Sequence, residues 1–389
     1  MNSILNEPRR RYHRPGIINE VRRIGKKKRK DEDLVFEVGR TPRDTLSKLL
    51  IVCGKVGDDN ANAYRAKAQE IGADFVIEPG RSWVLTDKTV KDCFEEGKHT
   101  GVLLIGTNKE LPATQIEYQG SYGFTDWFIQ DVDGDEIPDT PVGRIFGPQD
   151  TILYHLDPMI IDSNIAIVFD SQPGRSTRHV EGLRQLGFDV DVLRKFSEDD
   201  RKLLSVSEFI LQFSDGMFDS RIHGTPEKWA SHNAVILDHQ QASSIKFEGY
   251  PVVYSEACNT AMEGPLLRAF LDQGACYIGA TLDTMNNVEP FDDWRSCAYA
   301  DGWKFGFLDL LDTYDLIGQV KVGVDSAIFE NLEENVKREI AAVRAGGTFE
   351  ITLDNGLSAT EWVMFGNPLR RTTVGPAADY SPGRIIVDT

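Results

Sequence analysis

The feature that most constrains the fold is a regular alternation of short apolar runs with helical stretches. Residues 48–54 (KLLIVCG) and 101–106 (GVLLIG) are typical of buried strands, and residues 60–72 between them are typical of a helix. The alternation resumes with a strand-like run over 165–170 (IAIVFD) and a helical stretch over 177–186. Further strand-like runs lie at residues 73–78, 190–193, 233–237, 251–255 and 275–280. Strands separated by helices of this length predict an α/β fold with a mostly parallel sheet covered by helices on both faces.

The order of these segments predicts three parts of the chain. Residues 1–46 are a basic, disordered leader, residues 47–155 an N-terminal α/β lobe, and residues 156–389 a second lobe. The stretch 140–162 is rich in Pro and Asp, and we expect the joint between the two lobes there.

Charge is distributed unevenly along the chain, which narrows the choice of partners. The net charge is −18, but residues 1–30 carry +9, which leaves −27 on the remainder. A body this acidic repels nucleic acid, so only the leader suits contact with a phosphate backbone. The basic leader is equally suited to contact with the acidic remainder of its own chain. The third interpretation is a solvated, disordered segment.

Cysteine usage and the N-terminal composition bear on location. The five cysteines are odd in number and form no CxxC pair, which favours reduced thiols in a chain long enough to fold without disulfides. The first 30 residues hold no apolar block like that of an export signal. No window approaches the ~18 apolar residues of a membrane span. We therefore expect a cytoplasmic protein that does not enter a membrane.

Three residues that carry chemistry follow predicted strands. Asp170 ends the strand over 165–170, His223 follows a strand-like segment, and Cys258 follows the strand over 251–255. In an open parallel sheet, such residues gather outside the carboxyl ends of the strands. A cysteine before a helix start, here expected over 262–273, can be ionised by a neighbouring imidazole and by the helix's partial positive charge. A buried, inert cysteine is the alternative interpretation.

These residues lie in motifs that resemble a known clan of cysteine peptidases. His223-Gly224, with Glu-Ala-Cys258-Asn downstream, resembles the His-Gly and Ala-Cys signatures of the clan that contains caspases, legumains, clostripains, separases and gingipains. Within that clan the chain is most similar to the gingipain-like family. The resemblance continues through the segments at 102–113 (VLLIGTNKELPA), 125–145 (TDWFIQDVDGDEIPDTPVGRI), 223–229 (HGTPEKW), 274–281 (GACYIGAT) and 362–373 (WVMFGNPLRRTT).

The resemblance implies a caspase-like α/β/α sandwich with two side-by-side lobes, and hydrolysis of protein or peptide substrates through a covalent thioester. Cys258 would be the nucleophile, His223 the general base and acid, and the N–H groups of Gly224 and Cys258 the oxyanion hole. Asp170 matches a carboxylate that orients the imidazole in the family, although a strand-end Asp that caps the following turn is an equal alternative. This chemistry requires no cofactor.

The resemblance also places two acids near the substrate side chain. Glu256 occupies a position that lines the pocket for the residue before the scissile bond in clan members, and Asp283 is placed like a second pocket acid in some of them. A partly buried carboxylate selects Arg or Lys, so we expect cleavage after basic residues. Legumains also carry Glu-Ala-Cys and select Asn, which is the alternative preference, and a solvent-facing Glu256 is a further one.

An acidic segment offers a candidate metal site. Asp131, Asp133, Asp135 and Asp139 alternate with other residues around Gly134, a pattern of oxygen ligands that suits structural calcium. It is not an EF-hand, because the glycine falls at the fourth position and no glutamate stands at the twelfth. A plain acidic turn is the alternative, and it is slightly favoured.

Two functional classes follow from these observations. The first is a cytoplasmic cysteine endopeptidase, whose basic leader offers many cleavage sites and is expected to be removed by self-cleavage between Arg9 and Arg40. The second is a catalytically silent scaffold or binding protein with the same fold. The oligomeric state does not follow from the sequence.

Overall fold

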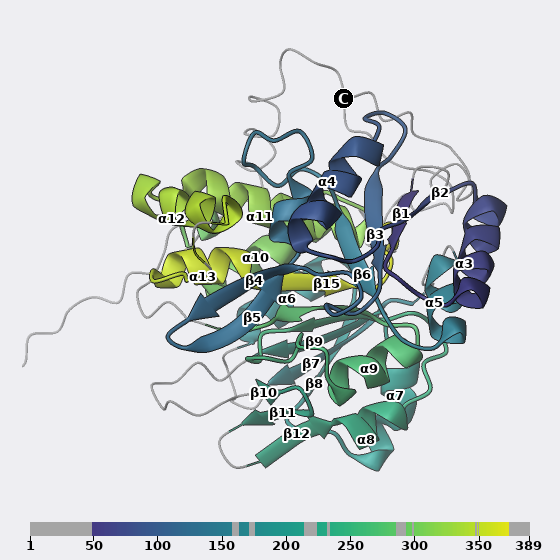
Figure 1. The fold of residues 1–389 in the computed structure, drawn as a ribbon. Helices are drawn as coiled ribbons and strands as arrows, with labels where there is room; N and C mark the ends of the chain where they lie inside the picture. Colours follow the sequence, from purple (N-terminus) through teal and green to yellow (C-terminus); the bar gives the residue numbers. More distant parts are fainter. Residues whose placement is uncertain are drawn as a thin grey trace, which may run out of the picture. The chain divides into compact units, whose positions relative to one another are not determined.

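A ten-stranded sheet forms the centre of the fold (Figure 1). The computed structural model describes residues 49–157, 163–170, 176–213, 224–231, 234–284, 293–297, 299–346, 348 and 350–372, which all belong to one compact unit, Arg40–Ile385. The strand order is β2-β1-β3-β6-β15-β14-β13-β9-β7-β8. The strands are β1 (Leu49–Cys53), β2 (Asp74–Ile77), β3 (Gly101–Ile105), β6 (Val142–Ile145), β7 (Ile165–Asp170), β8 (Asp189–Leu193), β9 (Phe209–Phe213), β13 (Val252–Ser255), β14 (Cys276–Ala280) and β15 (Trp362–Phe365).

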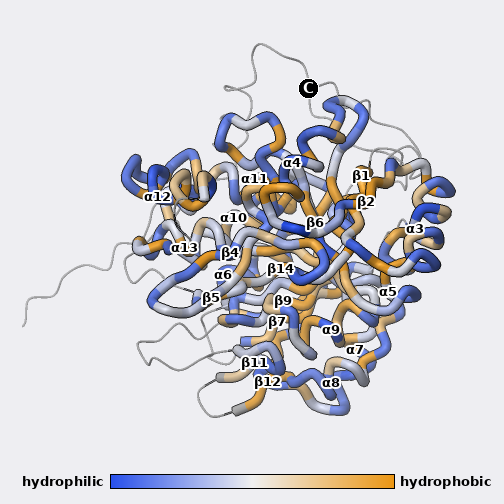
Figure 2. Tube along the Cα trace, viewed as in Figure 1, coloured by the Kyte–Doolittle hydropathy of each residue, from blue (hydrophilic) through white to orange (hydrophobic). Residues whose placement is uncertain are grey.

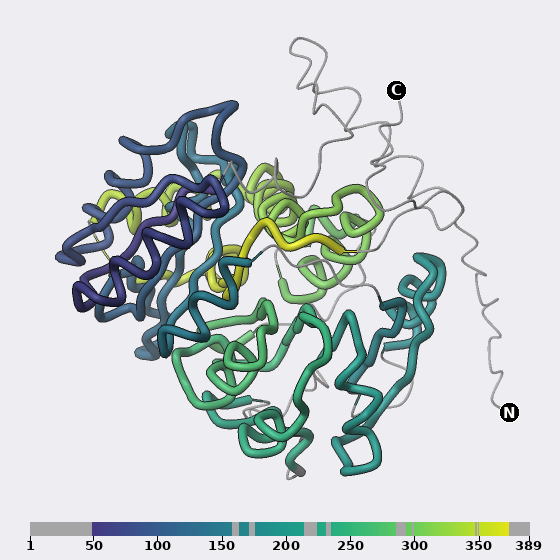
Figure 3. The backbone as a smooth tube through the Cα atoms, turned by 90° about the vertical axis from the view of Figure 1, so that its right-hand side faces the viewer, coloured from purple at the N-terminus to yellow at the C-terminus, as the bar shows by residue number. Residues whose placement is uncertain are grey.

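The sheet consists of two parallel groups that run in opposite directions. Neighbouring strands are parallel throughout, except that β15 is antiparallel to β14. The strand β15 comes from the end of the described chain and joins the group β2-β1-β3-β6 to the group β14-β13-β9-β7-β8. Figure 3 shows these groups as separate purple-to-blue and teal-to-green regions. Both predicted lobes therefore contribute strands to one sheet, and the lobe boundary at residue 155 stays a prediction.

Helices cover both faces of the sheet because strand residues alternate between two apolar surfaces. In β7, for example, Ala166 and Val168 pack on one face, and Ile167 and Phe169 pack on the other. The first face is covered by α4 (Trp83–Cys93), α6 (Thr177–Gln185), α10 (Ala300–Leu311), α11 (Ile317–Asn331), α12 (Glu334–Arg344) and α13 (Asp354–Thr360). The second face is covered by α3 (Asp58–Ile71), α5 (Gln149–Leu156), α7 (Arg201–Ser205), α8 (His239–Ser243) and α9 (Pro265–Asp272).

Figure 2 shows the resulting distribution of hydropathy, with orange stretches along the central strands and blue stretches along α3 and α12. Strands that are apolar on both faces are what a covered parallel sheet requires. The predicted α/β fold, a mostly parallel sheet flanked by helices on both sides as in an α/β/α sandwich, is confirmed.

One detail of the sequence prediction is wrong. The run at 233–237 forms β12 (Ala234–Asp238), which lies outside the large sheet in an antiparallel three-stranded sheet with β10 (Gly224–Thr225) and β11 (Lys228–Ser231). The described residues of the expected joint at 140–162 contain β6 and α5, whose apolar residues pack into the core, and the joint itself stays a prediction. An antiparallel hairpin of β4 (Thr114–Tyr118) and β5 (Ser121–Thr125) completes the described strands.

Candidate functional site

One edge of the sheet gathers the residues that the sequence singled out. The carboxyl ends of β7, β9, β13 and β14 lie at the same edge because these strands are parallel. That edge carries Asp170 at the end of β7 and residues 256–261, which we call the cysteine loop, directly after β13. Since β15 is antiparallel to β14, it starts at this edge, where Glu361 precedes it.

Backbone hydrogen bonds hold the cysteine loop against β9 and against the segment after β14. The Glu256 N–H donates to the Gln212 carbonyl oxygen (3.0 Å), and the Asn259 N–H donates to the Leu282 carbonyl oxygen (3.0 Å). The fully buried side chain of Gln212 accepts another N–H of the loop at 2.9 Å. Asn259 has a left-handed backbone (φ 59°), which asparagine tolerates better than most residues. These contacts fix the backbone on both sides of Cys258.

The Cys258 thiol is almost completely covered. The residue is 5% exposed, and Sγ lies 3.4 Å from Thr284 Oγ1. Burial raises the pKa of the thiol to about 11; hydrogen bonds with Thr284 oppose this rise, and the Asp283 and Glu361 carboxyls add to it. The expected help from a helix start is absent, because α9 begins only at Pro265. The thiol is therefore protonated at neutral pH unless a base takes its proton.

Gly224 lies directly against the cysteine loop. A Cβ atom at this position would lie 2.7 Å from the Cys258 carbonyl oxygen and 2.5 Å from Cγ2 of Thr260. Only a glycine leaves room for this approach of β10 to the loop. His223, the preceding residue, lies outside the described residues, so its pairing with Cys258 stays a prediction.

Asp170 holds the start of α6. Its Oδ2 accepts hydrogen bonds from the Ser176 N–H (3.1 Å) and the Ser176 hydroxyl (2.6 Å), and the side chain is buried. These contacts are those of the capping alternative. Asp170 was also predicted to orient the His223 imidazole. This stays a prediction, because His223 lies outside the described residues.

Glu256 is fully buried and paired with a lysine of α10. Lys304 Nζ donates to Glu256 Oε1 at 3.1 Å and also forms an ion pair with Asp301. Burial lowers the pKa of the Lys304 ammonium, but the two carboxylates outweigh this effect and the pKa is raised. A ligand cation at Glu256 would therefore have to compete with a resident one, and the predicted role of Glu256 in substrate selection stays a prediction.

Two further acids lie beside the cysteine loop. Asp283 is exposed, and its Oδ1 accepts a hydrogen bond from the Asn259 side chain at 2.7 Å. Glu361 is fully buried, and its backbone oxygen accepts a hydrogen bond from the Thr281 N–H at 3.2 Å. Sequence reasoning missed Glu361, whose one signal is a charged residue immediately before the apolar run 362–365.

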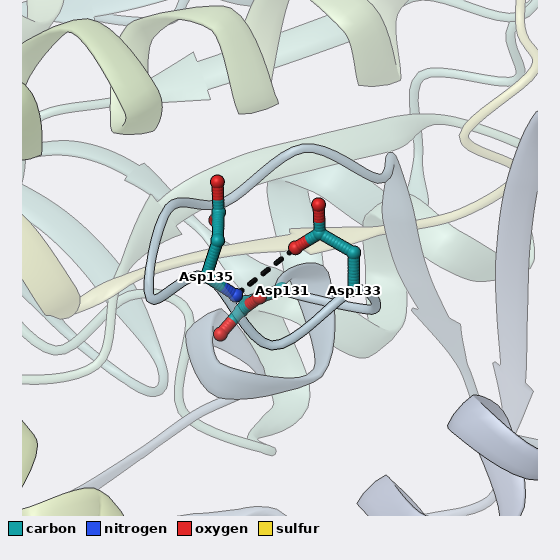
Figure 4. A group of neighbouring side chains, drawn as sticks. All are labelled: Asp131, Asp133 and Asp135. Atoms are coloured by element: carbon teal, nitrogen blue, oxygen red, sulfur yellow. Dashed lines mark hydrogen bonds between the residues drawn. The ribbon is translucent and has the colours of Figure 1, made fainter.

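The acidic segment after residue 130 forms a loop in which three carboxylates meet (Figure 4). Oxygen atoms of Asp131, Asp133 and Asp135 lie within 4.8 Å of one another. Asp139 is not part of this group: its Oδ1 accepts a hydrogen bond from the Thr140 hydroxyl at 2.9 Å, and burial raises its pKa.

Most of these carboxylate oxygens already have partners from the fold. Asp131 accepts the N–H groups of Gly134 (2.8 Å) and Glu136 (3.0 Å) and forms an ion pair with Arg344 of α12. Asp133 Oδ1 accepts the Asp135 N–H at 3.0 Å, the bond drawn in Figure 4. The carboxylate oxygens of Asp131, Asp133 and Asp135 are ligands of the type that calcium prefers. An ion at this place would share Asp131 with the Arg344 guanidinium. The calcium site stays a prediction.

Comparisons with known proteins support the fold. No protein-family model and no curated protein matches the chain. A solved structure described as "Structure of Protease" is similar to it, with a TM-score of 0.58 and 14% sequence identity, over 85% of this chain and 79% of that one. At this identity the likeness shows a shared fold. None of the described helices has the length and apolar character to cross a membrane.

Proposed function

We propose that this protein is a cysteine peptidase of the gingipain-like family in the caspase clan. The observation that carries the proposal is the packing of Gly224, the glycine of the His-Gly motif, on the Cys258 carbonyl group of the Ala-Cys motif. The similarity to a protease structure over 85% of the chain supports it.

The proposed chemistry needs no cofactor. His223 takes the proton of the Cys258 thiol, and the sulfur attacks the carbonyl carbon of the scissile peptide bond. The Gly224 and Cys258 N–H groups hold the oxyanion. The carbon–nitrogen bond then breaks, His223 gives its proton to the leaving amine, and water hydrolyses the thioester to release the acid and restore the thiol. Because burial and two carboxyls raise the pKa of the thiol, the reaction depends strongly on this base.

The proposed substrates are peptides with Arg or Lys before the scissile bond. Asp283 is exposed beside the cysteine loop, where a cation at the surface can reach it, whereas Glu256 is buried and paired with Lys304. A preference for Asn remains the alternative. Self-cleavage of the leader, at residues outside the described part of the chain, belongs to the same proposal.

A silent scaffold is the second candidate, and one observation favours it. Cys258 is 5% exposed, and burial raises the pKa of its thiol to about 11, which are properties of an inert structural cysteine.

Two variants separate these candidates. Cys258→Ala and His223→Ala should each lower the hydrolysis of a peptide library by several powers of ten, because the nucleophile or its base is lost. Cys276→Ala, at another buried thiol, should retain hydrolysis. Self-cleavage should remove N-terminal residues from the wild type but not from Cys258→Ala, and the intact mass of each protein measures this loss. An unchanged rate in Cys258→Ala would exclude the peptidase, and a wild type that cleaves no peptide would favour the scaffold.

A further inference from the structure

The Glu361 carboxyl lies at the same sheet edge as the cysteine loop. Trp362 pairs with Ala280 in the antiparallel ladder of β15 and β14, so Glu361 stands where β14 ends. Asp283 follows the last residue of β14 by three positions. Asn259 of the cysteine loop donates hydrogen bonds to Leu282 and Asp283 in this segment. Sheet topology thus brings Glu361 close to Cys258, although about a hundred residues separate them in sequence.

The Glu361 carboxyl is buried and lacks a hydrogen-bond partner in the described part of the chain. It is 0% exposed, and neither carboxyl oxygen has a hydrogen-bond partner among the described residues. Glu256, equally buried, has Lys304. A buried carboxyl normally requires a donor or a cation, so the missing partner indicates a group that the protein binds.

The neighbouring groups indicate the charge of that ligand. Burial and the nearby Asp283 carboxylate raise the pKa of Glu361 well above 4.5, and Glu361 contributes to the raised pKa of the Cys258 thiol. The buried Tyr254 hydroxyl also lacks a partner among the described residues, and its ring stacks on Trp362 at 5.5 Å. Two neighbouring carboxyls, Glu361 and Asp283, suit a cationic side chain better than a neutral or anionic one.

We propose that Glu361 is the buried acid that binds the cationic side chain before the scissile bond, with Asp283 at the exposed rim. This proposal rests on the proposed peptidase function. An entering guanidinium or ammonium pairs with the Glu361 carboxylate, and any proton on that carboxyl is released to solvent. Because Glu361 is fully enclosed here, the substrate must also displace the side chains that cover it.

The test compares peptides that differ only in charge. The ratio of kcat/KM for an Arg peptide to that for its neutral citrulline counterpart is measured for the wild type and for Glu361→Gln. We expect Glu361→Gln to lower this ratio by about 10-fold to 100-fold, because the buried charge-assisted pair is lost. Glu334→Gln, a loss of charge on the exposed side of α12, should leave the ratio unchanged. An unchanged ratio in folded Glu361→Gln overturns the proposal.

A second measurement separates the failure of this proposal from that of the peptidase function. If the wild type hydrolyses no peptide, the proposed function fails, and calorimetric titration with agmatine, a small guanidinium, decides the role of Glu361. Binding to the wild type that is lost in Glu361→Gln supports the site, and the absence of agmatine binding to the wild type overturns it.

Discussion

Asp131, in the acidic loop, and Glu361, beside the cysteine loop, are both buried acids but have opposite surroundings. Asp131 is fully buried, and its oxygens are occupied by two backbone N–H groups and the Arg344 guanidinium. Glu361 is equally buried, yet neither of its oxygens has a hydrogen-bond partner in the described part of the chain. A buried acid whose oxygens are paired with donors and a cation of the protein stabilises the fold. A buried acid that lacks such partners destabilises the fold and can pair with a ligand.

This difference predicts stability effects of opposite sign, and the largest should come from Asp131. Asp131→Ala removes the acceptor of two N–H groups and leaves Arg344 unpaired, which should lower the free energy of unfolding by about 3 kcal/mol. Urea denaturation measures it. Asp133→Ala, an exposed position in the same loop, is the control and should change the free energy of unfolding by less than about 1 kcal/mol. Equal losses in both variants would contradict a special role for Asp131.

Glu361→Gln should have the opposite effect, and the effect should depend on pH. The folded-state pKa of Glu361 is raised above the ordinary value of 4.5, so the folded chain binds more protons than the unfolded chain. The wild type therefore loses stability as pH rises above 4.5 toward the folded-state pKa, and Glu361→Gln removes this loss. The Tm of the variant should therefore gain on that of the wild type as the pH rises from 4.5 toward neutrality. A constant difference across this range would show that Glu361 has a partner.

The smallest effect should come from calcium. Since Arg344 already neutralises Asp131, about 1 mM calcium should raise the Tm of the wild type by less than about 1 °C relative to chelator. Arg344→Gln removes the resident cation, and its Tm should respond to calcium more strongly. A rise of several degrees in the wild type would instead establish a calcium site and remove the contrast between the two groups of acids.

Local pattern was sufficient for most of the sheet. Strands such as 165–170 are apolar on both faces and bounded by polar residues, so their boundaries agree with the structure to within about two residues. The insertion of β15 between β6 and β14, antiparallel to β14, was not predictable, because strand order depends on contacts between distant segments. The run at 233–237 has the composition of a core strand, yet its neighbours in space place it in a separate antiparallel sheet.

The same division applies to the candidate site. The sequence alone determined the α/β class and the position of Cys258 after a strand, because each depends on neighbouring residues or on the rule that parallel strands end at one edge. Only the tertiary structure decided which acids have partners. Lys304 reaches Glu256 from a helix 48 residues away, and Arg344 reaches Asp131 across 213 residues. Among the described residues, the Glu361 carboxyl beside the cysteine loop has no such partner. The physical reason is that the charge and pKa of a buried acid depend on burial and on through-space neighbours, which the order of residues along the chain does not specify.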